Sequence, residues 1–187
     1  MPKASVKRLI ECEKDDLIKL VLDIEKYPEF VPFCFDAKVY ENKNEGDLTK
    51  IIADLTIGKG PFKDTYKSDV VFNRKEDSIY VKNIEGPLNH LSNNWNFVNK
   101  ENGITEITFD IDFEIKNKFL NSLMVVSFQF GLEKIADAFQ KRAEELLAAL
   151  KTKFNAFLTV AFCIKDLFLA LNLHLLTCIL LPFFTPI

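Results

Sequence analysis

One long amphipathic segment constrains the fold of this chain more than any other part of the sequence. It spans residues 119–150 and reads FLNSLMVVSFQFGLEKIADAFQKRAEELLAAL. Its apolar residues recur every three or four positions, which places them on one face of an α-helix. They are Leu120, Leu123, Met124, Phe128, Leu132, Ile135, Phe139, Ala143, Leu146 and Leu150. Such a helix would extend roughly 48 Å, so we expect its apolar face to be covered by a broad surface.

The residues before this segment are predicted to supply that surface as a β-sheet. A first strand is expected at 5–12, and a helix follows from Lys14, where Asp15 and Asp16 favour a helix N-terminus. Further strands are predicted at 35–41, 48–57, 62–73, 79–84, 91–98 and 107–115, with turn residues between them. Short turns between consecutive strands indicate an antiparallel meander. The order predicts an α+β fold in which a curved antiparallel sheet wraps around the long C-terminal helix, with a ligand cavity between them.

Composition argues against several classes of function. Residues 1–150 carry 21 basic and 26 acidic side chains, which does not suit a DNA-binding surface. The four cysteines form no C-x-x-C pair and have no histidine at ligand spacing, so neither a zinc site nor a disulfide framework is indicated. They are Cys12, Cys34, Cys163 and Cys178. No signal peptide is evident at the N-terminus, and we expect a cytoplasmic protein with reduced, buried thiols.

No catalytic residue is predicted. The two histidines, His90 and His174, have no Ser, Cys or Asp at a spacing that suggests a triad, and no phosphate-binding glycine motif is present. We therefore expect a binding or transfer protein that is not an enzyme and that has no metal site.

Several short motifs occur in order along the first 150 residues. The most specific are YPEFVPFC at 27–34 and the combination of Gly86-Pro87 with Trp95-x-Phe97, and shorter ones are Ala53-Asp54-Leu55, Asp112-Phe113-Glu114 and Ala138-Phe139. In these residues the chain resembles the coenzyme Q-binding START-like family of the polyketide cyclase and lipid-transport superfamily, whose bacterial members include ribosome association toxins. The resemblance covers about residues 2–150, so we expect a START-like domain at 1–150 and an extension at 151–187.

The resemblance implies a helix-grip fold that encloses a hydrophobic isoprenoid ligand, with ubiquinone as the expected ligand, no other cofactor and a role in supporting respiratory electron transport. The residues expected to line the cavity are Tyr27, Phe30, Val31, Phe33, Tyr66, Trp95, Phe97, Phe128 and Leu132. Without the resemblance, such apolar side chains would be interpreted as ordinary core. Polar candidates for a headgroup contact are Asp54, Asn93, Asp112 and Glu114. We expect Asp112 and Glu114 to be solvated or salt-bridged, because alternation places both on the wet face of their strand.

The same resemblance implies an alternative function, that of a toxin that binds the large ribosomal subunit and blocks subunit association. The acidic composition counts against contact with RNA, although Lys59, Lys63 and Lys67 form a local basic patch.

The last 34 residues, 154–187, differ from the rest of the chain because 24 of them are apolar and none is glycine. Residues 167–184 are about long enough to span a bilayer as a helix. Three alternatives stay open for this extension: a membrane anchor that would hold the protein at the inner membrane, a helix-packing extension, and the translated remainder of a degraded reading frame.

Overall fold

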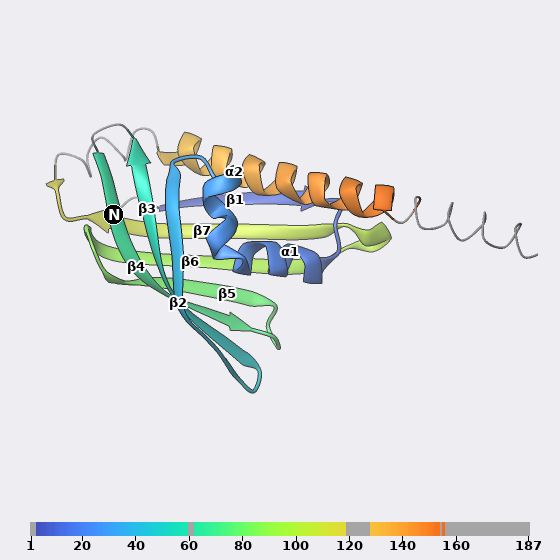
Figure 1. Ribbon diagram of the computed structural model, residues 1–187, viewed down its shortest axis with the longest axis horizontal. Coiled ribbons are helices and arrows are strands. Elements are labelled where there is room, and N and C mark those ends of the chain that lie inside the picture. The colour runs from blue at the N-terminus through green and yellow to red at the C-terminus, as the bar shows by residue number, and fades with distance from the viewer. Residues whose placement is uncertain (1–2, 60–61, 119–127, 154, 156–187) are drawn as a thin grey trace, which may run out of the picture. The chain divides into compact units, whose positions relative to one another are not determined.

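The computed structural model describes residues 3–59, 62–118, 128–153 and 155 (Figure 1). Its elements in chain order are β1 (Lys3–Ile10), α1 (Lys14–Leu22), η1 (Ile24–Lys26), α2 (Tyr27–Phe30), β2 (Cys34–Glu45), β3 (Leu48–Lys59), β4 (Phe62–Asn73), β5 (Ser78–Glu85), β6 (Leu88–Asn99), η2 (Glu101–Gly103) and β7 (Thr105–Ile115). Residues 128–153 are helical. The chain divides into two compact units, Met1–Glu145 and Leu146–Ile187. The helical residues 128–145, which we call the gripped helix, belong to the first unit.

The seven strands form one antiparallel sheet in the order β1-β7-β6-β5-β4-β3-β2. Strands β2 to β7 follow one another as the predicted meander, because short connections favour pairing between consecutive strands. β1 then pairs with β7 over its whole length, from Lys3 opposite Asp112 to Ile10 opposite Thr105. In Figure 1 the gripped helix runs alongside β1 and β7 on one side of the sheet, with α1 and α2 next to it.

The inner face of the sheet, which is the face toward the gripped helix, carries most of the core. Alternate residues of each strand point to this face, and the buried ones include Ile51, Val70, Phe72, Ile79, Trp95, Phe97, Ile107 and Phe109. The helix contributes Leu132, Ala136, Phe139 and Ala143, each at most 2% exposed. Their spacing of four, three and four residues defines one helix face. The predicted α+β helix-grip fold is therefore confirmed.

Two arginines attach the gripped helix to its surroundings. Arg8 of β1 donates hydrogen bonds to Glu133 and, at 3.0 Å, to Asp137. Arg142 pairs with Glu29 of α2 at 2.8 Å. The hydrogen bond from Arg8 lowers the pKa of Glu133 below its usual value, so this ion pair is present at neutral pH. The polar rim of the helix thus fixes the orientation of its apolar face.

The structure corrects two expected boundaries. The turn predicted at 42–46 is shorter, because β2 continues to Glu45 and the chain reverses at Gly46, where φ is +63°. Residues 42–45 are polar and exposed, and they pair with β3 at the edge of the sheet, so that no alternation of apolar residues signals this part of the strand. The first strand is Lys3–Ile10, so Cys12 lies beyond it, although its side chain is buried.

The helix prediction at 119–150 is confirmed over 128–150 and continues to 153, whereas 119–127 lie outside the described residues. Leu146 and Leu150, which belong to the second unit, are 44% and 56% exposed. The predicted membrane span at 167–184 also lies outside the described residues. Within the part that the structure describes, no helix combines the length and the apolar composition needed to cross a bilayer.

Candidate ligand-binding site

Aromatic side chains join α2, the gripped helix and the sheet. The ring of Phe139 packs edge-on against Tyr27 at 5.3 Å, Phe30 at 5.1 Å and Trp95 at 5.1 Å between ring centroids. Trp95 in turn stacks on Phe109 of β7 at 4.1 Å. Edge-to-face and offset-stacked rings are the favoured aromatic geometries. The expected lining residues Tyr27, Phe30 and Trp95 therefore belong to one cluster centred on Phe139.

A second aromatic contact lies further along β7. Phe128 of the gripped helix packs on Phe113 at 4.5 Å between centroids. Phe113 is paired with Leu91 of β6, whereas Phe109 is paired with Trp95. Along β6 and β7 the two aromatic contacts are thus separated by a single inner-face pair, Asn93 and Ile111.

The two tyrosines of the expected lining carry hydroxyl groups within this region. The hydroxyl of Tyr27 donates a hydrogen bond to the carbonyl of Val21, at the end of α1. Burial raises the pKa of both Tyr27 and Tyr66 well above the usual value for a phenol. Both groups are therefore neutral at physiological pH, and neither can act as a general base there.

The position of Tyr66 depends on Gly86, a residue of the Gly-Pro motif. Gly86 has a φ of +124°, and a Cβ atom on it would lie 2.8 Å from the carbonyl oxygen of Thr65 and from the Cα of Tyr66. Only a glycine allows this close approach of two backbones. The motif thus shapes the inner face next to Tyr66.

The remaining expected lining residues differ in their exposure. Phe97 and Leu132 are 3% and 1% exposed, and Val31 is partly buried against the core. Phe33 is 40% exposed and adopts a positive φ of 67°, while its carbonyl accepts a hydrogen bond from Gly58 at 3.0 Å. The structure thus brings Tyr27, Phe30 and Trp95 together and leaves Phe33 at the surface; that these residues line a ligand cavity stays a prediction.

The four polar candidates separate into two groups. Asp54, Asp112 and Glu114 lie on the outer face, where Asp54 accepts a hydrogen bond from Tyr40 at 2.8 Å and Asp112 pairs with Lys3 at 3.2 Å. Asn93 instead lies on the inner face. Its Oδ1 is buried and has no hydrogen-bond partner among the described residues. Asn93 as a whole is partly exposed, and its neighbours on this face are apolar.

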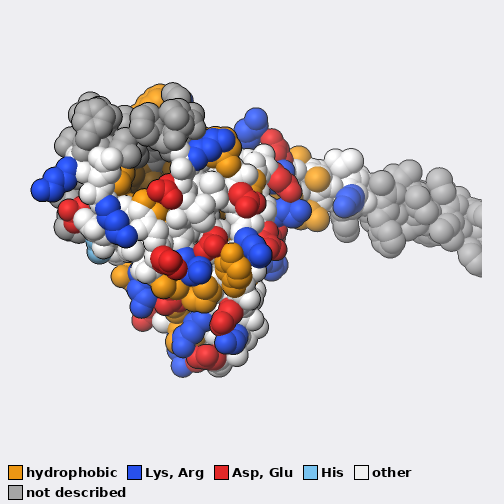
Figure 2. Space-filling view, turned by 60° about the vertical axis from the view of Figure 1, so that its left-hand side comes forward, with side chains coloured by type: hydrophobic (Ala, Val, Ile, Leu, Met, Phe, Trp, Pro, Cys, Tyr) orange, Lys and Arg blue, Asp and Glu red, His pale blue; other side chains and the backbone are white. Residues whose placement is uncertain are grey.

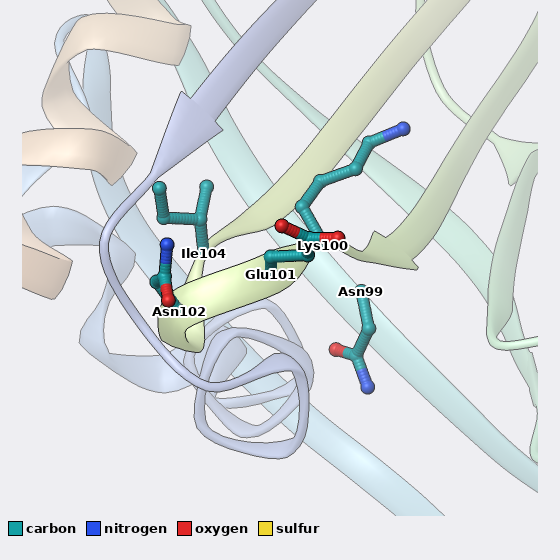
Figure 3. A pocket seen from close by; sticks show the side chains of 5 residues that line it. All are labelled: Asn99, Lys100, Glu101, Asn102 and Ile104. Carbon is teal, nitrogen blue, oxygen red and sulfur yellow. The ribbon is translucent and has the colours of Figure 1, made fainter.

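A surface pocket lies at the turn between β6 and β7 and is lined by Asn99, Lys100, Glu101, Asn102 and Ile104 (Figure 3). In Figure 3 the side chains of Asn99 and Lys100 point away from those of Asn102 and Ile104. This mostly polar lining does not suit a hydrophobic ligand, and it includes none of the expected residues. Figure 2 shows basic and acidic side chains interspersed over the face in view. Within the described part of the chain, no group of His, Cys, Asp or Glu could hold a metal ion, and Cys12 and Cys34 are free thiols.

The curved sheet, the gripped helix and the apolar inner face define a helix-grip protein, and comparisons with known sequences indicate the same class. A family model described as polyketide cyclase / dehydrase and lipid transport matches residues 10–144. The chain therefore belongs to this family, as its motifs suggested. A START superfamily protein from Mycobacterium smegmatis has the same fold, with a TM-score of 0.67 and 19% identity over 77% of this chain and 98% of that protein.

Two curated relatives are more similar in sequence. The ribosome association toxin RatA of Rickettsia prowazekii is 30% identical over 143 residues, which cover 75% of this chain and 94% of the relative. The mitochondrial coenzyme Q-binding protein COQ10 of Dictyostelium discoideum is 30% identical over 134 residues, which cover 71% of this chain and 64% of the relative. One relative is thus named for binding coenzyme Q and the other for association with ribosomes, and neither name describes an enzyme.

Proposed function

We propose that the protein binds a hydrophobic isoprenoid ligand, with ubiquinone as the favoured candidate, between the sheet and the gripped helix, and so supports respiratory electron transport. The observation that carries this proposal is the uneven burial of the inner face. Trp95 and Phe109 are 4% exposed beneath the helix, whereas Val81, Ile111 and Tyr66 are only partly buried. An apolar face that its own helix covers incompletely suits an apolar ligand.

Binding without catalysis suits the chemistry of this face. The hydroxyl groups of Tyr27 and Tyr66 stay protonated at neutral pH because burial raises their pKa values. Arg8, whose position in β1 faces the helix, is engaged by Glu133 and Asp137. None of these three groups is a free base for proton abstraction.

The test is to purify the full chain from a quinone-producing host, extract it with organic solvent and identify the lipids by mass spectrometry. We expect ubiquinone in a stoichiometric amount, and none from an equal amount of an unrelated protein purified in parallel. Recovery of no isoprenoid lipid, together with failure of the delipidated chain to take up a short-chain ubiquinone, would contradict the proposal. Separating membrane from cytosol before purification shows in addition whether residues 154–187 hold the protein at the inner membrane.

A second candidate is association with the large ribosomal subunit, and it is favoured by two exposed rings on the edge strand β2. The register of β2 with β3 shifts at two bulges, and the extra residues there are Phe35 and Tyr40, which are 48% and 51% exposed. The ammonium group of Lys63 lies 3.4 Å from the Phe35 ring centroid, and that of Lys67 lies 5.3 Å from the ring of Tyr40. Exposed rings beside lysines suit stacking on unpaired bases next to phosphates.

Co-sedimentation with ribosomal subunits over a salt series tests this second candidate. We expect the wild-type chain to migrate with the large subunit at low salt, and the double variant Phe35→Ala, Tyr40→Ala to stay at the top of the gradient. Lys75→Ala, which removes an exposed charge at the turn after β4, is the matched control. A wild-type chain that stays at the top at every salt concentration excludes this function.

A further inference from the structure

Three buried side-chain oxygens have no hydrogen-bond partner among the described residues: Asp54 Oδ1, Asn93 Oδ1 and Asp112 Oδ1. Two of them belong to carboxylates on the outer face whose other oxygen has a partner, namely Tyr40 for Asp54 and Lys3 for Asp112. Asn93 is different, because it lies on the inner face. Its carboxamide is therefore the unusual polar group of the core.

The neighbours of Asn93 on the inner face are apolar. Along β6 they are Leu91 and Trp95, and across the sheet they are Val81 of β5 and Ile111 of β7. Leu91 and Trp95 are 5% and 4% exposed, whereas Val81 and Ile111 are only partly buried. The carboxamide thus stands in the row of the inner face where the described residues leave the sheet incompletely covered.

Two other polar residues of the inner face are satisfied by the sheet itself. The hydroxyl of Ser68 donates to the carbonyl of Ala53 at 3.2 Å, and the amide nitrogen of Asn83 donates to the carbonyl of Leu88 at 3.4 Å. Asn93 has no such backbone partner for its Oδ1. Because an unpaired buried polar group destabilises a fold, a valine or leucine here would be the more stable choice. An asparagine at this position therefore indicates a partner that the chain itself does not supply.

We propose that the Oδ1 atom of Asn93 binds the polar end of the isoprenoid ligand, and that this end is an aromatic ring that carries a hydroxyl group, as in a reduced quinone (a quinol). The carboxamide oxygen accepts hydrogen bonds, so its missing partner is a donor, which a ring hydroxyl supplies and a ring carbonyl does not. The aromatic contacts on either side, Trp95 with Phe109 and Phe113 with Phe128, offer flat surfaces to such a ring. This inference rests on the proposed function and adds to it the group that selects the headgroup.

The experiment compares two ligands on the delipidated full chain by calorimetry without oxygen: a short-chain ubiquinol, which is the reduced form of ubiquinone, and an alkylbenzene with the same isoprenoid tail and no oxygen atoms. Asn93→Leu removes both hydrogen-bonding groups and keeps a similar volume. The matched control is Asn94→Leu, the same change at the next residue, which lies on the outer face opposite Asp110. We expect Asn93→Leu to weaken ubiquinol binding about tenfold and to leave alkylbenzene binding equal or tighter, whereas Asn94→Leu changes neither.

The urea midpoint of the ligand-free protein gives an independent readout. We expect Asn93→Leu to raise it, because the change removes an unpaired polar atom, so that stability and ubiquinol affinity change in opposite directions. Asn93→Ala, which cannot overpack the site, should show the same selective loss of ubiquinol affinity. Unchanged ubiquinol affinity, an equal loss for both ligands, or a lower midpoint for Asn93→Leu would each overturn the inference and show Asn93 to be a structural residue. If the wild-type chain binds neither ligand, the proposed function itself fails.

Discussion

Phe139 is the residue whose removal tests the helix-grip arrangement most directly. It is 2% exposed, and its ring contacts Tyr27 and Phe30 of α2 and Trp95 of β6. The gripped helix, α2 and the sheet therefore meet at one side chain. Truncation of this ring should loosen all three contacts together, because a close-packed interior relaxes only partly around a cavity.

The size of the effect follows from the burial and from the three ring contacts. Phe139→Ala should lower the free energy of unfolding by about 3–5 kcal/mol, the usual range for a buried phenylalanine. Phe139→Leu keeps most of the apolar volume but loses three edge-on contacts of about 0.5–1.5 kcal/mol each. Since these contacts share one ring, their losses do not add fully, and we expect a cost of about 1.5–3 kcal/mol.

Urea unfolding followed by tryptophan fluorescence measures the effect, because Trp95 is the only tryptophan in the chain and lies 5.1 Å from Phe139. We expect the native emission of Phe139→Ala to shift to longer wavelength as the indole becomes more accessible. Phe130→Ala is the control, because Phe130 lies on the same helix but is 66% exposed, and it should change stability by at most about 0.5 kcal/mol. A cost below about 1 kcal/mol for Phe139→Ala, with unchanged emission, would refute the packing described above.

Four further changes test separate features. Gly86→Ala should lower the free energy of unfolding, measured with urea, by more than about 2 kcal/mol, because the new Cβ would meet backbone atoms at 2.8 Å. Gly46→Ala should lower it by about 1 kcal/mol, because the space around Gly46 is open and only its positive φ opposes the change. Gly131→Ala should raise the melting temperature, corresponding to about 0.5–1 kcal/mol, because no atom lies within 4 Å of the added Cβ in the helix. The raised pKa of Tyr27 means that the fold favours the neutral phenol, so the contribution of this group to the free energy of unfolding should be fully present below about pH 10 and decrease as the pH rises further. Urea midpoints measured across the alkaline range should show this decrease for the wild-type chain and a smaller one for Tyr27→Phe. Burial raises the pKa of Cys34 to about 11, so peptide mass spectrometry should find it alkylated at pH 8 only after denaturation.

Most of the fold could be predicted from the sequence, because periodicity reports burial on one face. The alternation in 107–115 and the three-and-four spacing after residue 128 each specify an element and its buried side. The prediction was wrong where burial does not vary. Residues 42–45 are exposed throughout, and only pairing with β3 makes them a strand. Gly131 is a poor helix former within the gripped helix, yet a Cβ there would meet no atom within 4 Å, so close packing is not the reason for a glycine at this position.

The site could be predicted less well, because residue type does not tell a core position from a cavity position. Trp95 and Val81 are both apolar inner-face residues, but one is 4% exposed and the other only partly buried. That difference depends on where the helix crosses the sheet, which sequence spacing does not encode. Phe33 shows the same limit, since its positive φ leaves it 40% exposed although its motif suggested a lining residue.

For Asn93, the strand pairing identifies a candidate ligand contact that the residue type alone does not. Its place between Leu91 and Trp95 already assigns it to the dry face by alternation, but an asparagine on that face is ordinary when a backbone group bonds it, as for the part-buried Asn83. Only the partners across the sheet, Val81 and Ile111, show that the Oδ1 atom of Asn93 has none at hand. A cavity with purely apolar walls would select ligands by size and shape alone. One unpaired carboxamide oxygen between two aromatic contacts would add chemical selection, because it would favour a ring that carries a hydroxyl group over a hydrocarbon of the same shape.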